Sequence, residues 1–263
     1  DAVVAVNDVG AITYYSDAKI YDLVGLITNG QARIFRNGIG AVYERLERRQ
    51  PDYFMLHLGW FNYERFSFFG AGDKRLTDFH IKKEPAYYVV GSPEVCTDFK
   101  KELVNSGDEP VLVHDESGVF RIKDRIDILD IESEEAHSYR IREAVVPLVP
   151  GTMLEEGLSY GKRIIDGGRV TSGSEEFYIS GLTPGFDIKL VRRSYDAQPC
   201  SVKVEIDGKD AGLWQEKSGT GFTEHVFIIK GGLVQKSRAR IKLYETEKRP
   251  FNSFYYWIYQ GRE

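Results

Sequence analysis

Short hydrophobic runs alternate with a helix-like segment in the first half of the chain. Residues 2–6, 19–24, 53–58 and 87–91 are largely apolar or β-branched, which is typical of strands buried on both faces. Between them, Val42, Tyr43 and Leu46 recur with Ile39 at helical spacing over residues 39–49, and Pro51 ends that segment. This alternation predicts an N-terminal α/β layered domain with a mostly parallel sheet.

The pattern changes in the second half, where strand-like segments follow one another without a long helical repeat. We expect strands at residues 176–179, 186–193, 201–206, 224–229, 239–244 and 254–259. The dipeptide Asp207-Gly208 follows one of them and suits a two-residue hairpin turn with positive φ angles. Together these features predict a C-terminal antiparallel β-sandwich of jelly-roll-like topology.

An acidic stretch at residues 127–135 lies between the two patterns. We therefore expect two domains, an α/β domain at 1–135 and a β-sandwich domain at 136–263. Ser133 is expected to cap a short helix at this junction, with His137 and Tyr139 anchoring it. No GxSxG or Cys/His signature accompanies these residues, which argues against a nucleophilic hydrolase.

Composition limits the possible partners. The chain has 263 residues with a formal net charge of -5, so nucleic acid is not an expected partner. No run approaches the roughly 20 apolar residues of a membrane span. Two distant cysteines, Cys96 and Cys200, and five scattered histidines predict neither a disulfide, a metal site nor a cofactor. Because the chain begins at Asp1 without an apolar leader, we expect a fragment of a longer protein.

The first candidate site follows the first two predicted strands. Asn7 and Asp8 come directly after residues 2–6, and Asp22 lies near the end of the next strand. Ligands of open α/β sheets bind outside the carboxyl ends of strands, and two carboxylates can share a metal or divide acid and base roles. The alternative is that both aspartates only cap local turns.

Two further candidates are aromatic. His57 and Trp60 leave the predicted strand at 53–58 and could present a stacking platform for a sugar, or belong to the core. In the second half, Tyr255 and Trp257 alternate with Tyr256, so one aromatic face of that strand points to solvent or to a neighbouring domain. Aromatic residues available for stacking on sugars, or for filling the sandwich core, are Tyr160, Tyr178, Tyr195, Trp214, Tyr255, Tyr256, Trp257 and Tyr259.

Residues 4–16 (VAVNDVGAITYYS), 19–26 (KIYDLVGL), 49–54 (RQPDYF) and 59–61 (GWF) carry a family resemblance. This pattern resembles the soluble segment that follows the membrane spans of bacterial multi-spanning glycosyltransferases. The relatives concerned are polyprenyl-phosphate-sugar-dependent mannosyl- and aminoarabinosyltransferases. The resemblance covers residues 1–61 most closely and extends to about residue 140. It implies a non-catalytic domain on the periplasmic or extracytoplasmic side, because that family holds its transferase carboxylates in the membrane portion.

Three functional hypotheses follow. The first is an extracytoplasmic accessory or glycan-binding region of a membrane glycosyltransferase-like protein, with the membrane-spanning part of the parent chain and a glycan or lipid-linked sugar as partners. The second is a free-standing carbohydrate-active enzyme that uses Asp8 and Asp22. The third is a structural interaction module, which a large exposed apolar patch would support.

Overall fold

The structure is a computed structural model that describes residues 3–15, 17–57, 75–81, 84–90, 108–111, 120–142, 151–247 and 249–261. Contacts divide the chain into two compact units, residues 1–106 and residues 107–263. The division precedes the boundary that we expected at 135/136. It does so because β6 (Phe120–Asp127) pairs along its length with β17 (Tyr255–Gly261) and so belongs to the C-terminal unit.

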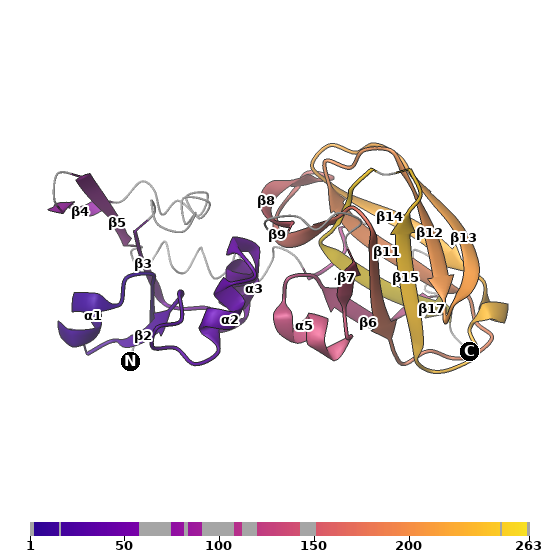
Figure 1. Ribbon diagram of the computed structural model, residues 1–263, viewed down its shortest axis with the longest axis horizontal. Coiled ribbons are helices and arrows are strands. Elements are labelled where there is room, and N and C mark those ends of the chain that lie inside the picture. Colours follow the sequence, from indigo (N-terminus) through magenta and orange to yellow (C-terminus); the bar gives the residue numbers. More distant parts are fainter. Residues whose placement is uncertain are drawn as a thin grey trace. The chain divides into compact units, whose positions relative to one another are not determined.

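One mixed sheet organises the N-terminal unit (Figure 1). Its strands, in the order β2-β1-β3-β5-β4, are β2 (Lys19–Asp22), β1 (Val3–Val6), β3 (Tyr53–His57), β5 (Glu84–Val90) and β4 (Arg75–Ile81). The described α-helices of this unit are α1 (Gly10–Tyr15), α2 (Gln31–Phe35) and α3 (Ile39–Arg49). In α3 the predicted apolar positions Val42, Tyr43 and Leu46 are fully buried, and Gln50 ends the helix with a left-handed φ of 44°.

The predicted α/β domain with a mostly parallel sheet is wrong. β1 pairs in parallel with β2 and β3, but β3 with β5 and β5 with β4 are antiparallel. Hydrophobic runs indicate strands without giving their direction, and two residues between β4 and β5 can join only antiparallel strands. The described helices are short, with 5 to 11 residues, so the described part of the chain is predominantly β.

Antiparallel strands form three sheets in the C-terminal unit (Figure 1). The first is β13-β12-β15-β10-β7, the second β14-β11-β17-β6 and the third β16-β9-β8. The remaining bounds are β7 (Arg140–Arg142), β8 (Thr152–Ser159), β9 (Lys162–Thr171), β10 (Ser174–Ile179), β11 (Ile188–Tyr195), β12 (Cys200–Ile206), β13 (Lys209–Glu216), β14 (Phe222–Ile229), β15 (Ala239–Glu245) and β16 (Phe251–Ser253). A helix α5 (Ile131–Ala136) and a 3-10 turn η3 (Gly231–Leu233) complete the unit.

The core of this unit lies between the first two sheets, which makes it a β-sandwich. Alternate residues of β12, Val202, Val204 and Ile206, face the core together with Tyr256 and Ile258 of β17. The alternation follows from the two-residue period of a strand. Consequently each of the two sheets has one inner face in the core and one outer face, and the outer faces are where a binding site can form.

Two local predictions at the strand ends have different outcomes. The hairpin turn at Asp207-Gly208 is confirmed, with φ angles of 50° and 80° and Ile206 paired with Lys209. The predicted cap of the short junction helix is wrong. Asp130 is the N-cap of α5 and accepts the backbone N–H groups of Glu132 and Ser133 at 3.0 and 3.4 Å. The Ser133 hydroxyl instead accepts the N–H of Asp127 at 2.9 Å.

Among the described helices, none combines the length and the apolar composition that crossing a bilayer requires.

Candidate functional site

The N-terminal aspartates hold their own loops. Asp22 is fully buried, and its carboxylate accepts the backbone N–H groups of Val24, Gly25 and Ile27 at 2.9, 3.0 and 2.7 Å. Asp8 accepts the N–H of Gly10 at 3.2 Å. Asn7 is buried beside the end of β1. The Asp22 oxygens are therefore engaged by the loop that follows β2, as the capping alternative expects.

A small pocket of about 320 Å³ lies in the N-terminal unit near β2 and α3, with Tyr21, Gln31, Arg45 and Arg49 in its wall. The hydroxyl of Tyr21 donates to Oε1 of Gln31 at 2.6 Å. Burial raises the pKa of Tyr21, although Arg45 acts to lower it. The pocket therefore offers a neutral hydroxyl at physiological pH.

The two aromatic candidates after β3 cannot be assigned a geometry. His57 ends β3, but its side chain and Trp60 lie outside the described residues. Their predicted role as a stacking platform stays a prediction.

Tyr255 and Trp257 lie on the outer face of the second sheet, and this face is covered. Their rings stack with centroids 4.5 Å apart, and Trp257 is completely buried. With Val191 and Tyr259 they form an apolar cluster that we call the covered face. Residues 108–111 lie against it, since Trp257 Nε1 donates to the carbonyl of Asp108 at 3.0 Å. In this arrangement the two rings are packed and are not presented to a sugar.

A buried arginine secures the covered face. Arg193 bonds to Asp166 and to Glu224, each at 3.1 Å, and donates to the carbonyl of Glu109 at 3.0 Å. Its guanidinium also lies 4.7 Å from the ring centroid of Trp257. Arg192 precedes Arg193 on β11. Both are fully buried, with Arg193 toward the covered face and Arg192 toward Glu216 inside the sandwich.

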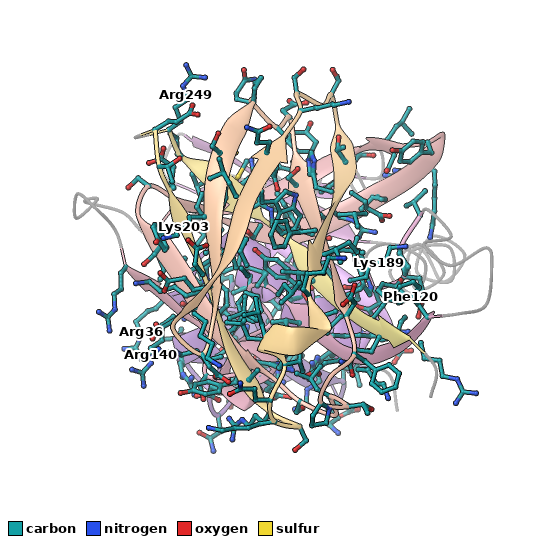
Figure 2. All side chains as sticks on the ribbon, turned by 90° about the vertical axis from the view of Figure 1, so that its right-hand side faces the viewer. Arg36, Phe120, Arg140, Lys189, Lys203 and Arg249 are labelled. Atoms are coloured by element: carbon teal, nitrogen blue, oxygen red, sulfur yellow. The ribbon has the colours of Figure 1, made fainter. Side chains whose placement is uncertain are left out.

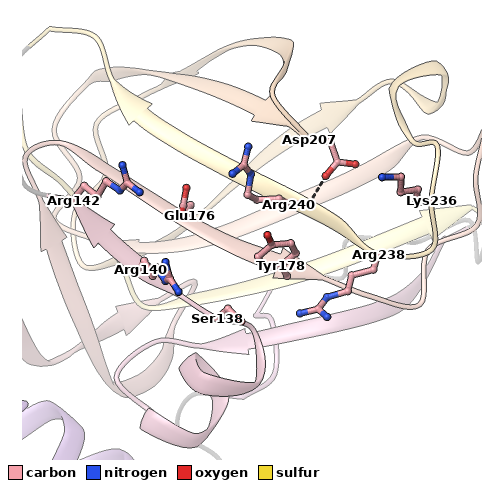
Figure 3. Close-up of a pocket in the computed structure, with 9 residues that line it drawn as sticks. All are labelled: Ser138, Arg140, Arg142, Glu176, Tyr178, Asp207, Lys236, Arg238 and Arg240. Carbon is pink, nitrogen blue, oxygen red and sulfur yellow. Dashed lines mark hydrogen bonds between the residues drawn. The ribbon is translucent and has the colours of Figure 1, made fainter.

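The outer face of the first sheet, which we call the open face, carries a broad pocket of about 840 Å³ (Figure 3). Three strands and three loops contribute to its lining, which is polar and rich in cations. The lining residues are Ser138, Arg140, Arg142, Glu176, Tyr178, Asp207, Lys236, Arg238 and Arg240. Glu176 and Tyr178 project from the middle of this group in Figure 3. We call this site the arginine–tyrosine pocket.

Strand register explains the arrangement of the pocket. On β10, Glu176 pairs with Arg140 of β7 and with Lys242 of β15, while Tyr178 pairs with Arg240. Directly paired residues point to the same side of a sheet, and adjacent strands lie about 4.8 Å apart. A central column with a carboxylate and an aromatic ring is thus flanked by two cationic columns that are about 10 Å apart.

Many cations of this unit are paired with carboxylates, whereas the five cations of the pocket are paired with no described carboxylate. Within the described part of the chain, no ion pair involves Arg140, Arg142, Lys236, Arg238 or Arg240. Elsewhere in the unit, ion pairs form at Arg125, Arg163, Arg169, Arg192, Arg193, Lys203, Lys230 and Arg249. Five cations face two carboxylates in the lining, so the pocket attracts negatively charged groups.

Tyr178 supplies the exposed aromatic surface of the pocket. Its side chain is 37% exposed, and the guanidinium of Arg238 lies 4.7 Å from its ring centroid. The backbone N–H of Tyr178 donates to the carbonyl of His137 at 2.8 Å. On the loop side, Asp207 Oδ1 accepts the N–H of Arg240 at 2.9 Å and holds the hairpin turn against β15.

His137 links the pocket wall to β6. Its Nε2 lies 3.1 Å from Asp124 and its Nδ1 2.7 Å from the carbonyl of Ser133. Burial acts to lower the pKa of His137, but the hydrogen bonds to Asp124 and Ser133 outweigh it and the pKa is raised. Burial likewise acts against the charge of Asp124, yet the bonds from His137 and the N–H of Ser180 lower its pKa. Both groups are therefore charged in weakly acidic solution.

Metal ligands do not gather in either unit. Considered within one unit at a time, the described histidine, cysteine and carboxylate side chains contain no group of three that is close enough to hold an ion.

From the sequence, Tyr178 was only one of several aromatic candidates, and the pocket arginines were not predicted. A signal was present, because Arg140 and Arg142 stand two residues apart around the apolar Ile141, and Arg238 and Arg240 around the buried Ala239. That spacing indicates cations on one face of a strand. It does not show that two such strands flank a third.

Comparisons with known proteins give one family match with a defined range. Residues 1–113 match the model of a family described as a domain of unknown function, DUF8728. No curated protein matches the sequence.

Several solved structures are similar to part of the chain. One is the native structure of a family 35 carbohydrate-binding module from Clostridium thermocellum, with a TM-score of 0.31 and 11% identity over 41% of this chain and 87% of that chain. Another is a family 6 carbohydrate-binding module from Clostridium cellulolyticum in complex with xylose, with a TM-score of 0.33 and 15% identity over 51% of this chain and 95% of that chain. A third is a β-1,3-glucan-binding family 6 module from Bacillus halodurans, with a TM-score of 0.32 and 14% identity over 51% of this chain and 94% of that chain.

Proposed function

We propose that the C-terminal unit binds a glycan in the arginine–tyrosine pocket. The observation that carries this proposal is the exposed ring of Tyr178 in the centre of an open pocket lined by hydrogen-bonding side chains. Its volume of about 840 Å³ is within the range of ligand sites, which is roughly 300–1,000 Å³. A ligand of this site must itself be mostly polar.

Sugars match the two kinds of surface that the pocket presents. Each ring has a C–H face that packs on an aromatic side chain, and Tyr178 offers such a surface. Around the ring, hydroxyl groups donate to carboxylates and accept from guanidinium groups. Glu176 and Asp207 supply acceptors, and Arg140 and Arg240 supply donors.

The competing enzyme hypothesis has less support in the N-terminal unit. A glycosidase needs two carboxyl groups that reach the glycosidic bond. Asp22 is buried and its oxygens are bound by three backbone N–H groups, so a substrate cannot reach them without opening that loop. We therefore propose binding and not hydrolysis as the activity of this chain.

A finer part of the proposal concerns the parent protein. The resemblance over residues 1–61 supports attachment to a membrane glycosyltransferase-like region, with this chain on the extracytoplasmic side. Topology mapping of the complete protein with reporter fusions at residue 263 tests this part. A cytoplasmic position for the fusion would contradict it.

Native affinity electrophoresis of the whole chain tests the glycan proposal. Gels containing a neutral polysaccharide (xylan, β-1,3-glucan or dextran) or an acidic one (polygalacturonate or dextran sulfate) should retard the protein in at least one case. Tyr178→Ala should abolish that retardation. Tyr160→Ala is the matched control, because Tyr160 is also exposed but lies outside the pocket lining. Unretarded migration in every gel, or equal retardation of Tyr178→Ala and the original chain, would overturn the proposal.

A further inference from the structure

We propose that the glycan bound by this pocket is acidic, with carboxylate or sulfate groups on its sugars. This inference rests on the proposed function and adds the class of ligand. It is carried by five cations that line one pocket and form no ion pair with the described residues.

The arginines of the pocket lack carboxylate partners among the described residues. Arg140, Arg142, Arg238 and Arg240 have no carboxylate partner among the described residues, although arginines elsewhere in the unit do. A guanidinium group binds a carboxylate or a sulfate through two parallel N–H···O bonds. The pocket thus holds several donors for which the described residues supply no carboxylate, and a ligand can supply one.

The spacing of the cations suits a linear acidic glycan. The cationic columns of β7 and β15 run on both sides of β10, about 10 Å apart. A linear glycan that lies along β10 packs one sugar on Tyr178 and directs substituents to either side, where they meet Arg140 or Arg240. Alternating orientation of successive sugars brings anionic groups to both columns.

The two carboxylates of the lining favour an acidic glycan over a ligand with a uniformly negative surface. Glu176 stands in the central column, and Asp207 borders the pocket next to Arg240. A surface of uniform negative charge, such as a nucleic acid or an anionic bilayer, would be repelled at Glu176. A glycan places hydroxyl donors there and keeps its anionic groups at the flanks.

Equilibrium binding to defined polymers tests the inference. We would titrate the whole chain with polygalacturonate and with dextran sulfate, and with their neutral counterparts, methyl-esterified polygalacturonate and dextran. We expect the acidic polymer of at least one pair to bind at least tenfold more tightly than its neutral counterpart. Raising NaCl from 50 to 500 mM should weaken acidic binding, because exposed charges are screened.

Variants locate the effect in the pocket. Arg140→Gln and Arg240→Gln should each weaken acidic binding about tenfold, since each removes one charge-assisted contact. Arg249→Gln, a matched change outside the lining, should leave it unchanged. Thermal melting of each variant should match that of the original chain, because both pocket arginines are only partly buried or exposed.

The outcomes separate the two proposals. Equal affinity for acidic and neutral polymers, with Tyr178→Ala still abolishing both, would overturn the acidic class and leave glycan binding intact. Binding of polyglutamate or duplex DNA as tightly as of acidic glycans would show anion exchange without recognition of sugars, and would overturn the inference. Absence of binding to any polysaccharide would remove both.

Discussion

The two outer faces of the β-sandwich use the same residue types in opposite ways. On the covered face, Tyr255, Trp257 and Tyr259 pack together, and Arg193 is buried between Asp166 and Glu224. On the open face, an exposed tyrosine stands among arginines that no described carboxylate pairs. Figure 2 shows the two faces through their labelled residues, Lys203 and Arg140 on one side of the sandwich and Lys189 and Phe120 on the other.

This difference teaches that composition alone does not locate a binding surface. The covered face has more aromatic side chains, yet residues 108–111 occupy the place that a ligand would take. The open face has fewer rings but leaves polar and charged atoms for an outside partner. A face whose hydrogen bonds are completed within the chain serves stability, whereas one with unpaired donors can serve recognition.

The largest expected contrast comes from one substitution made on both faces. Arg193→Met should lower the free energy of unfolding by about 3–5 kcal/mol, because it leaves Asp166 and Glu224 buried without their cation. Arg140→Met on the open face should change it by no more than about 0.5 kcal/mol. Guanidinium unfolding curves measure both values. Similar losses at the two positions would contradict the division into a structural and a recognition face.

A smaller contrast should appear when one aromatic residue on each face becomes phenylalanine. Trp257→Phe removes the N–H that donates to Asp108 and reduces packing in a fully buried site, at a cost of about 1–2 kcal/mol. Tyr178→Phe should stay within about 0.5 kcal/mol, since the Tyr178 hydroxyl has no hydrogen bond to the described residues. The same unfolding curves serve as the readout. A loss of unfolding free energy for Tyr178→Phe larger than this limit would show that the open face also contributes to the stability of the fold.

The smallest expected effect concerns the pH dependence of stability at His137, which links the pocket wall to β6. Its folded pKa is raised, so the added stability is complete below its unfolded value near 6.5 and is lost as pH rises through the folded pKa. The pKa of Asp124 is lowered, so its contribution is present above its unfolded value near 3.8 and is lost as pH falls. The pair therefore contributes most between about pH 4 and 6.5, by about 1 kcal/mol.

Unfolding curves measured at pH 5.5 and 8.5 test this expectation. The original chain should lose stability between the two pH values, and His137→Gln and Asp124→Asn should each flatten the difference. If His137→Gln kept the same pH dependence, the loss of stability between pH 5.5 and 8.5 would belong to other groups.

The alternation of apolar and polar residues was sufficient to predict the positions of many strands of the C-terminal unit. All six strands expected from alternating residues overlap β10, β11, β12, β14, β15 and β17, and the Asp207-Gly208 turn forms as its composition requires. Strands such as β9 and β13 escaped prediction because Gly167-Gly168 and Gly212 interrupt their patterns. In the N-terminal unit the positions of β1, β2, β3 and β5 were recognisable, but β4 and the direction of pairing were not.

What the sequence by itself determined is local: which residues alternate, where hairpins turn and which side chains share one face of a strand. Only the tertiary structure decided that residues 108–111 cover Trp257, that Arg193 meets Asp166 and Glu224, and that β7 and β15 flank β10 with unpaired cations. The physical reason is that alternation depends on a period of two residues within one strand. Burial and ion pairing depend on which distant segments the chain brings together, and no single strand contains that information.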